Sequence, residues 1–149
     1  MSLRPESVIP GTLALELLMA RNDRAAVAIT GLWAYPSGFE FLVSGRIRPD
    51  VMWEYDEDYI SAEAQNPSLR IGIQFATGDG PSMSMILSGG GRGGFEWRYW
   101  VSPLPPLGSL AFVCEWPALG IPETRVGIDA ETIREAAARS IQLWPEPRH

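Results

Sequence analysis

The residue types that most often do chemistry in proteins are nearly absent from this chain. It has no lysine, its one histidine is His149, and its one cysteine is Cys114. These three residue types supply most general bases, Schiff bases and activated nucleophiles, so the serines and threonines here lack a neighbouring base. The sequence therefore favours a non-enzymatic protein, and it predicts no catalytic residue, no cofactor and no metal ion.

An acidic and aromatic stretch is the first candidate binding site. Trp53 and Tyr55 stand beside Asp56 and Asp58 in the run WEYDEDY. Carboxylates next to aromatic rings could coordinate Ca²⁺ or bind the hydroxyl face of a sugar, but a calcium loop needs more oxygen ligands and a glycine at its sharp turn. The alternative is a solvated acidic connection whose rings pack back onto a sheet.

The glycine-rich run GGGRGG, residues 89–94, is the second candidate. Glycine runs that cradle phosphate lie between a strand and a helix, with lysine and serine or threonine following. A strand pattern follows this run instead. The sequence predicts a mobile hairpin loop, and the alternative is a flap in which Arg92 binds an anion.

The third candidate is the outward face of a hairpin expected from residues 95–101 and 110–116. Opposite charges stabilise cross-strand neighbours, so we expect Arg98 to lie opposite Glu115. Trp100 beside this pair would stack on a sugar or form the centre of a protein interface. Alternatively, the C-terminal helix or the acidic connection covers this face, and Trp100 belongs to the core.

Two other routes to chemistry are weaker. Cys114 lies between Val113 and Glu115, without the positive neighbour that lowers a thiol pKa, which predicts a buried structural thiol. Paired carboxylates could hydrolyse a glycoside, but nothing in the spacing of the acidic residues selects a pair.

Composition restricts the partners of this chain of 149 residues. Its net charge of −6 opposes binding to nucleic acid. Its apolar runs are far shorter than a membrane span, which predicts no membrane partner and a soluble protein. A single cysteine offers no internal disulfide, in keeping with a cytoplasmic location. No boundary or repeat is visible, so residues 1–149 are expected to form one domain.

Alternating apolar and polar residues predict strands. Residues 39–48 carry Phe39 and Phe41 on one side, with Glu40 among the polar residues opposite. Pro-Ser-Gly at 36–38 predicts a three-residue hairpin loop that places Tyr35 opposite Phe39 and Trp33 opposite Phe41.

The one expected helix covers about residues 130–143, with Asp129 as its N-cap and Ile133, Ile141 and Trp144 on its apolar side. Seven or eight antiparallel strands and this helix predict a mainly β protein. The expected fold is an immunoglobulin-like antiparallel two-sheet sandwich with one C-terminal α-helix, and a closed barrel is the alternative.

The segment RYWVSPLPPLGSLAFVCEWPALGIPETR, residues 98–125, resembles a signature of an uncharacterised family of small bacterial proteins, mostly from high-GC genomes. The runs YPSGFEF, FATGDG and GGGRGG are similar to the same pattern, from about Ile9 to Trp144. The resemblance implies one domain and no catalytic residues.

From the missing catalytic residue types and six tryptophans, we expect an interaction or scaffold domain that self-associates through an aromatic-bearing sheet face. The alternative is a small-ligand or carbohydrate-binding module. The candidate ligand-binding residues are Trp53, Tyr55, Asp56, Asp58, Arg92, Arg98, Trp100 and Glu115.

Overall fold

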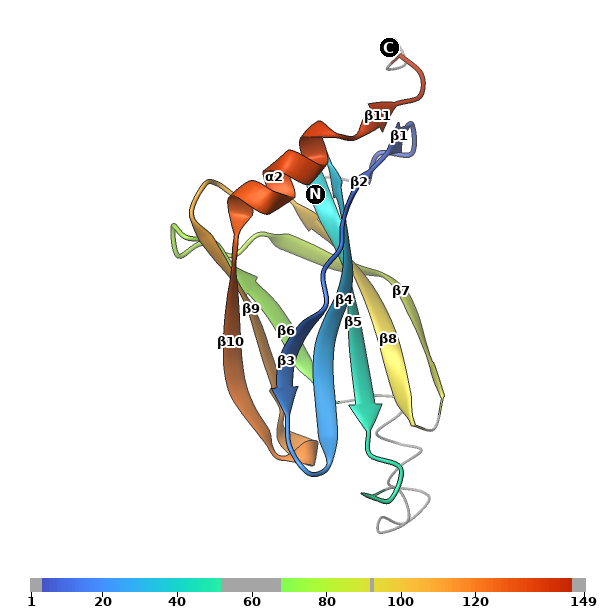
Figure 1. Ribbon diagram of the computed structural model, residues 1–149, viewed down its shortest axis with the longest axis vertical. Coiled ribbons are helices and arrows are strands. Elements are labelled where there is room, and N and C mark those ends of the chain that lie inside the picture. Colours follow the sequence, from blue (N-terminus) through green and yellow to red (C-terminus); the bar gives the residue numbers. More distant parts are fainter. Residues whose placement is uncertain (1–3, 52–67, 92, 146–149) are drawn as a thin grey trace.

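The computed structural model describes residues 4–51, 68–91 and 93–145, which fold mainly as β-strands with one α-helix (Figure 1). The elements are β1 (Val8–Ile9), β2 (Gly11–Leu13), β3 (Leu17–Arg21), β4 (Ala25–Tyr35), β5 (Gly38–Ile47), β6 (Arg70–Gln74), β7 (Ser82–Gly91), β8 (Gly94–Ser102), β9 (Ser109–Trp116), the 3-10 helix η2 (Pro117–Leu119), β10 (Ile121–Asp129), α2 (Ala130–Ala138) and β11 (Ile141–Gln142).

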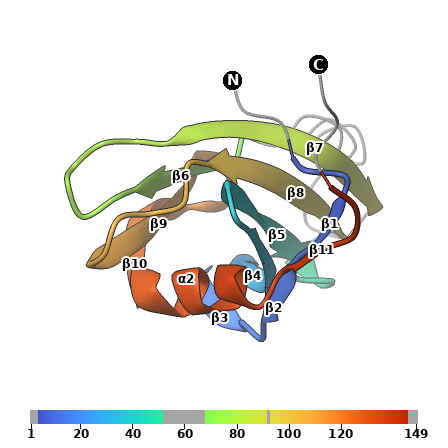
Figure 2. The same ribbon diagram turned by 90° about the horizontal axis from the view of Figure 1, so that it is seen from above.

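The strands pair antiparallel in three sheets. A six-stranded sheet has the order β2-β4-β5-β8-β7, with β3 also paired to β4, and a three-stranded sheet has the order β10-β9-β6. Strands β1 and β11 form a small two-stranded sheet beside the others (Figure 2). The predicted mainly β, antiparallel architecture with one helix towards the C-terminus is confirmed.

The two larger sheets share one apolar core. The ring of Phe41 on β5 lies 5.1 Å from that of Phe112 on β9, and Phe95 on β8 lies 5.4 Å from Trp116 on β9. Cys114 is a buried free thiol in this core, as predicted. The face of the six-stranded sheet that points into the core is called the inner face below, and the opposite one the outer face.

The β4–β5 hairpin exists, but its predicted register is wrong by one residue. Tyr35 pairs with Gly38, so the turn contains two residues and not three. Trp33 consequently pairs with Glu40 and not with Phe41. The side chains of Trp33 and Tyr35 therefore lie on the outer face, whereas the sequence pattern predicted them on the inner face beside Phe41 and Phe39.

A β-bulge in β4 explains this change of face. The pairing shifts between Ile29 and Leu32, so that one extra residue of β4 is accommodated there. Because side chains alternate along a strand, one extra residue moves every later side chain to the opposite face. Ile29 is fully buried before the bulge, and Leu32 and Ala34 are fully buried after it.

The predicted hairpin joining residues 95–101 to 110–116 is also wrong. Strand β8 pairs with β5 on one side and β7 on the other, so both of its edges are already occupied. The proline-rich connection 103–108 instead crosses to the other sheet, where β9 pairs with β6 and β10. Glu115 accordingly lies opposite Arg70, with 3.2 Å between their charged groups, and not opposite Arg98.

The helix is shorter than predicted. Asp129 caps it as expected, since its side chain accepts a hydrogen bond from the Glu131 amide. Ile133 is fully buried, but the helix ends at Ala138, and Ile141 joins the two-stranded sheet with β1. The residues expected to form the last helical turn instead include β11, which pairs with β1. Trp144, which was expected on the apolar side of the helix, is exposed. None of the helices in the described residues is long and apolar enough to cross a membrane.

The glycine-rich run forms strand ends where a loop was expected. Gly90 pairs with Phe95 and Gly91 with Gly94, which leaves a tight β7–β8 hairpin. A β-carbon on Gly94 would lie 2.5 Å from the carbonyl oxygen of Gly45, so glycine is needed for this close strand approach. Arg92, the proposed anion ligand, lies outside the described residues.

Candidate functional site

The outer face of the six-stranded sheet carries the polar residues of the candidate site. Along β5, Phe41 and Val43 point into the core and are fully buried, while Glu40 and Leu42 belong to the outer face. The pairing of Glu40 with Trp33 on β4 and with Trp100 on β8 brings three outer-face residues into one row across the sheet.

A buried carboxylate is the centre of this row. Glu40 is only 1% exposed, and its Oε1 accepts a hydrogen bond of 2.6 Å from Nη1 of Arg4. The Tyr35 hydroxyl donates to the same oxygen at 3.4 Å, and Arg98 Nη1 lies 3.6 Å from the other carboxylate oxygen. A buried carboxylate needs such partners, because burying an unpaired charge is very unfavourable.

Aromatic rings surround these charged groups. The guanidinium of Arg98 lies 4.0 Å from the ring centroid of Trp33, a cation–π geometry. Tyr35 and Trp100 meet edge to face, with ring centroids 5.5 Å apart. The set of Arg4, Trp33, Tyr35, Glu40, Arg98 and Trp100 is called the Glu40 cluster below.

The charges of the Glu40 cluster influence its titratable groups. The hydrogen bond to Glu40 raises the pKa of Arg4 above its ordinary value. Burial raises the pKa of the Tyr35 hydroxyl above 10.0, and the negative charge of Glu40 raises it further, whereas Arg4 and Arg98 act in the opposite direction. One carboxylate facing two guanidinium groups gives the cluster an excess of one positive charge.

The N-terminal segment, residues 4–9, covers the Glu40 cluster. Arg4 comes from this segment, and Val8 packs in one buried group with Tyr35 and Trp100. The segment is held beside the sheet by the pairing of β1 with β11 and by a 2.7 Å hydrogen bond from the Leu143 amide to the Ser7 carbonyl. Trp100 is therefore only 2% exposed. It packs against Val8 of the N-terminal segment and against Tyr35, and it is not open to solvent.

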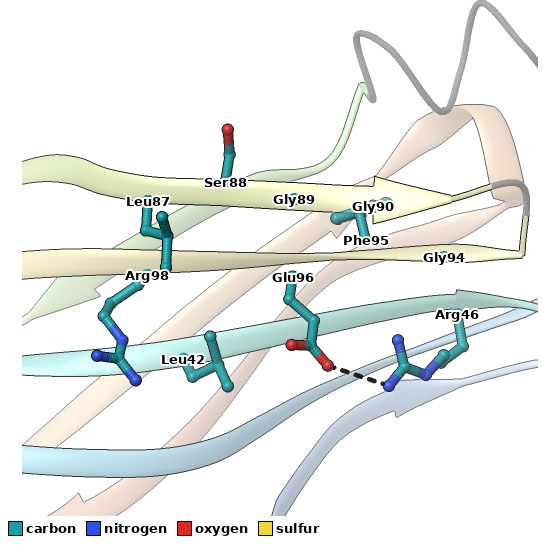
Figure 3. A pocket seen from close by; sticks show the side chains of 10 residues that line it. All are labelled: Leu42, Arg46, Leu87, Ser88, Gly89, Gly90, Gly94, Phe95, Glu96 and Arg98. Atoms are coloured by element: carbon teal, nitrogen blue, oxygen red, sulfur yellow. Dashed lines mark hydrogen bonds and ion pairs between the residues drawn. The ribbon is translucent and has the colours of Figure 1, made fainter.

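An open depression adjoins the Glu40 cluster on the same face (Figure 3). Its volume is about 470 Å³, and it lies over the paired strands β5, β8 and β7. Glu96 and Arg46 form an ion pair of 3.3 Å at one end, and Leu42 lies between Glu96 and Arg98. The lining residues are Leu42, Arg46, Leu87, Ser88, Gly89, Gly90, Gly94, Phe95, Glu96 and Arg98.

Glycine contributes directly to this depression. A β-carbon built on Gly89 would meet no described atom within 4 Å, so the missing side chain leaves space above the sheet. Arg98 belongs both to the depression and to the Glu40 cluster, and its buried Nε has no hydrogen-bond partner among the described residues. A ligand could therefore meet two arginines, one carboxylate and apolar side chains on this face.

The structure unites only two of the candidates chosen from the sequence. Arg98 and Trp100 are neighbours in β8 and both belong to the Glu40 cluster. Glu115 lies in the other sheet, paired with Arg70, so its expected place beside Arg98 is wrong. The remaining candidates, Trp53, Tyr55, Asp56, Asp58 and Arg92, lie outside the described residues.

Sequence reasoning did not select Glu40, Arg4, Trp33 or Tyr35 as site residues. The available signal was a glutamate within the otherwise apolar run GFEFLV, residues 38–43. A charged residue in such a run requires a partner if it is buried. The part of the chain that the structure describes has no group of three His, Cys, Asp or Glu side chains that could hold a metal ion.

Comparison with known proteins gives information on the fold alone. No family model and no curated protein matches this chain. A solved structure, the crystal structure of a conserved domain protein from Bacillus anthracis, is similar with a TM-score of 0.53 and 10% sequence identity. The similarity covers 89% of this chain and 48% of that one, so the chain spans about half the length of its structural neighbour.

Proposed function

We propose that this chain is a non-enzymatic protein-interaction domain that self-associates through strand β7 and the adjoining outer face of its six-stranded sheet. Two larger sheets that share one core support an immunoglobulin-like two-sheet sandwich as its architecture. A reducing compartment such as the cytoplasm suits its single free thiol, Cys114. Membership of the bacterial family that the sequence resembles is part of the same proposal.

The observation that carries this proposal is the composition of β7. Strand β7 is an edge strand of the six-stranded sheet. Its ten residues, SMSMILSGGG, include no charged side chain and no proline. Met85, Ile86 and Leu87 are consecutive and exposed. Edge strands that stay unpaired are usually protected by charges, prolines, β-bulges or covering segments, since their free amides and carbonyls can pair with another strand. Strand β7 has a bulge between Met85 and Leu87, so the regular stretches on either side of it are the ones that offer a free edge.

A second copy of the chain is the partner that best fits this edge. Two antiparallel edge strands related by a two-fold axis present the same residues to each other, as in most homodimers. Two chains of net charge −6 repel each other, and an uncharged strand adds no local repulsion at the contact. The exposed apolar side chains would be buried by the same pairing.

Analytical ultracentrifugation at micromolar concentration tests this proposal with Leu87→Lys. A charge on the edge should oppose strand pairing, and we expect dissociation of the dimer to become on the order of tenfold easier or more. The substitution also reduces the net negative charge, so weaker association could not come from greater repulsion between the copies. Leu87 is 62% exposed, so the fold should tolerate the lysine.

The matched control is Leu107→Lys. Leu107 is 70% exposed and lies in the connection between β8 and β9, so the same chemical change should leave association unaltered. A wild-type chain that sediments as a strict monomer would contradict the proposal. Equal effects of the two lysine substitutions would also contradict it.

A second candidate function is a small-ligand module, favoured by the depression of about 470 Å³ beside Arg46 and Arg98. The buried Trp100 offers no open ring for a sugar to stack on, so the depression is the better docking place. A thermal-shift panel of glycans and metabolites tests this candidate, with Gly89→Val to fill the depression. Stabilisation that survives this substitution, or none from any compound, would count against it.

A further inference from the structure

We propose that Glu40, Tyr35 and Trp100 form a binding site for the guanidinium group of an arginine-bearing peptide, and that Arg4 of the same chain occupies this site as an internal competitor. The inference does not require self-association, since these residues lie in β4, β5, β8 and the N-terminal segment, whereas the proposed contact between copies is centred on the edge strand β7. According to this inference, the N-terminal segment binds to the site in the way that a separate peptide would.

The carboxylate is positioned by the sheet and not by the segment that covers it. Glu40 lies within β5, which is paired on both sides, to β4 through Trp33 and to β8 through Trp100. A residue held by two neighbouring strands keeps its place when a covering segment leaves. The receptor half of the site is therefore preorganised, which limits the entropy lost on binding.

The site needs a cation at the position that Arg4 now occupies. Arg4 supplies the 2.6 Å contact to Glu40, and the contacts from Tyr35 and Arg98 are longer, at 3.4 and 3.6 Å. Charge-assisted hydrogen bonds are strong when short, and they weaken as the distance grows. If Arg4 left, the carboxylate would keep the two weaker of its three partners among the described residues.

The covering segment is attached by few contacts. Its strand β1 contains two residues and pairs only with the two residues of β11 in the described structure. The Arg4 side chain is 42% exposed and reaches the carboxylate from the solvent side. Segments with few buried contacts open at a small fraction of the global free energy of unfolding.

A peptide that turns after its arginine fits the site better than a free small cation, because the segment in place makes a turn at Glu6 and Ser7 before β1. The segment in place uses a guanidinium at Arg4, an apolar side chain at Val8 and a backbone carbonyl at Ser7. Main-chain pairing combined with side-chain pockets is a common mode of peptide recognition. The expected ligand therefore carries an arginine and, four residues later, a small apolar side chain.

Titration calorimetry tests this inference with the 149-residue chain and a synthetic peptide of the sequence of residues 1–9. The receptor is the Arg4→Ala variant, in which the internal competitor is lost. We expect this variant to bind the peptide on the order of tenfold more tightly than the wild-type chain does, and to prefer it by a similar factor over a peptide with alanine in place of arginine.

Two further variants locate the binding. Glu40→Gln added to Arg4→Ala should abolish the preference for the arginine peptide, whereas Glu96→Gln added to Arg4→Ala should preserve it, because Glu96 lies at the open end of the same face. Circular dichroism checks that each variant is folded. No binding at millimolar peptide, equal binding of the arginine and alanine peptides, or a preference that survives Glu40→Gln would each overturn the inference.

Discussion

The two faces of the six-stranded sheet are made from alternate residues of the same strands, and they follow different rules. On the inner face, Phe39, Phe41 and Val43 of β5 are all fully buried and all apolar. On the outer face, Glu40 is buried and Leu42 borders an open depression. The inner face excludes water because a second sheet covers it, whereas burial on the outer face depends on short segments that come from elsewhere.

The outer face therefore differs from end to end. Glu40 has a guanidinium above it and is covered, while Glu96, on the neighbouring strand, is 49% exposed and pairs with Arg46 near the glycine-rich hairpin. Two glutamates on one face have different surroundings because only one lies beneath the N-terminal segment. On this sheet, a polar residue is therefore buried where the chain itself supplies its partner.

The largest expected effect compares the two faces at adjacent positions. Phe41→Ala should lower the free energy of unfolding by about 3–5 kcal/mol, since the ring is fully buried and packs at 5.1 Å from Phe112 and 5.4 Å from Tyr99. Leu42→Ala should lower it by less than about 1 kcal/mol. Denaturant unfolding measures both values, and a Leu42 effect as large as that of Phe41 would mean that the outer face is covered there.

A smaller effect compares the two ends of the outer face. Glu40→Gln should lower the free energy of unfolding by about 1–3 kcal/mol, because the contacts to the arginines lose their charge assistance and a donor-only NH2 group replaces one of the two acceptor oxygens. Glu96→Gln should change it by about 0–1 kcal/mol, as for other exposed ion pairs. Thermal or denaturant unfolding gives both values.

Salt provides the control for this second comparison. Added salt should reduce the effect of Glu96→Gln much more than that of Glu40→Gln, since solvent ions screen exposed pairs more strongly than covered ones. Equal effects of the two substitutions at low and high salt would show that the N-terminal segment does not cover Glu40 in solution.

The sequence allowed the strands and the helix start to be predicted, because these depend on neighbouring residues. Alternation correctly assigned Glu40 to the outer face, and Asp129 correctly marked the start of the helix. The same alternation misplaced Trp33 and Tyr35, since one extra residue at a bulge reverses every later position. Apolar aromatic rings suit either face, so composition did not reveal the error.

The candidate site was harder to predict because its parts come from distant segments. Arg4 and Glu40 are separated by 36 positions in the chain, and no local pattern signals their contact. The expected pairing of Arg98 with Glu115 assumed that strands neighbouring in sequence are also paired. Charge complementarity alone cannot distinguish a hairpin from a connection that crosses between sheets. In the structure, Glu115 forms its ion pair with Arg70 and not with Arg98.

The smallest expected effect concerns alkaline pH and again compares the two faces, through Tyr35 on the outer and Tyr99 on the inner side. Burial raises the pKa of both hydroxyls above 10.0, and only that of Tyr35 is raised further by Glu40. Above about pH 10 the unfolded chain loses these protons first, so stability falls as the pH rises towards the folded values. Tyr35→Phe and Tyr99→Phe should each make this fall shallower.

Glu40→Gln separates the two tyrosines. It removes the negative charge beside Tyr35 and should lower the pKa of that hydroxyl towards its ordinary value, while the pKa of Tyr99, whose shift comes from burial, should stay unchanged. Tyrosine-selective NMR labelling during an alkaline titration follows each hydroxyl separately. If both pKa values moved together, the carboxylate would not act locally beneath the N-terminal segment, and the distinction between the two faces would lose its electrostatic basis.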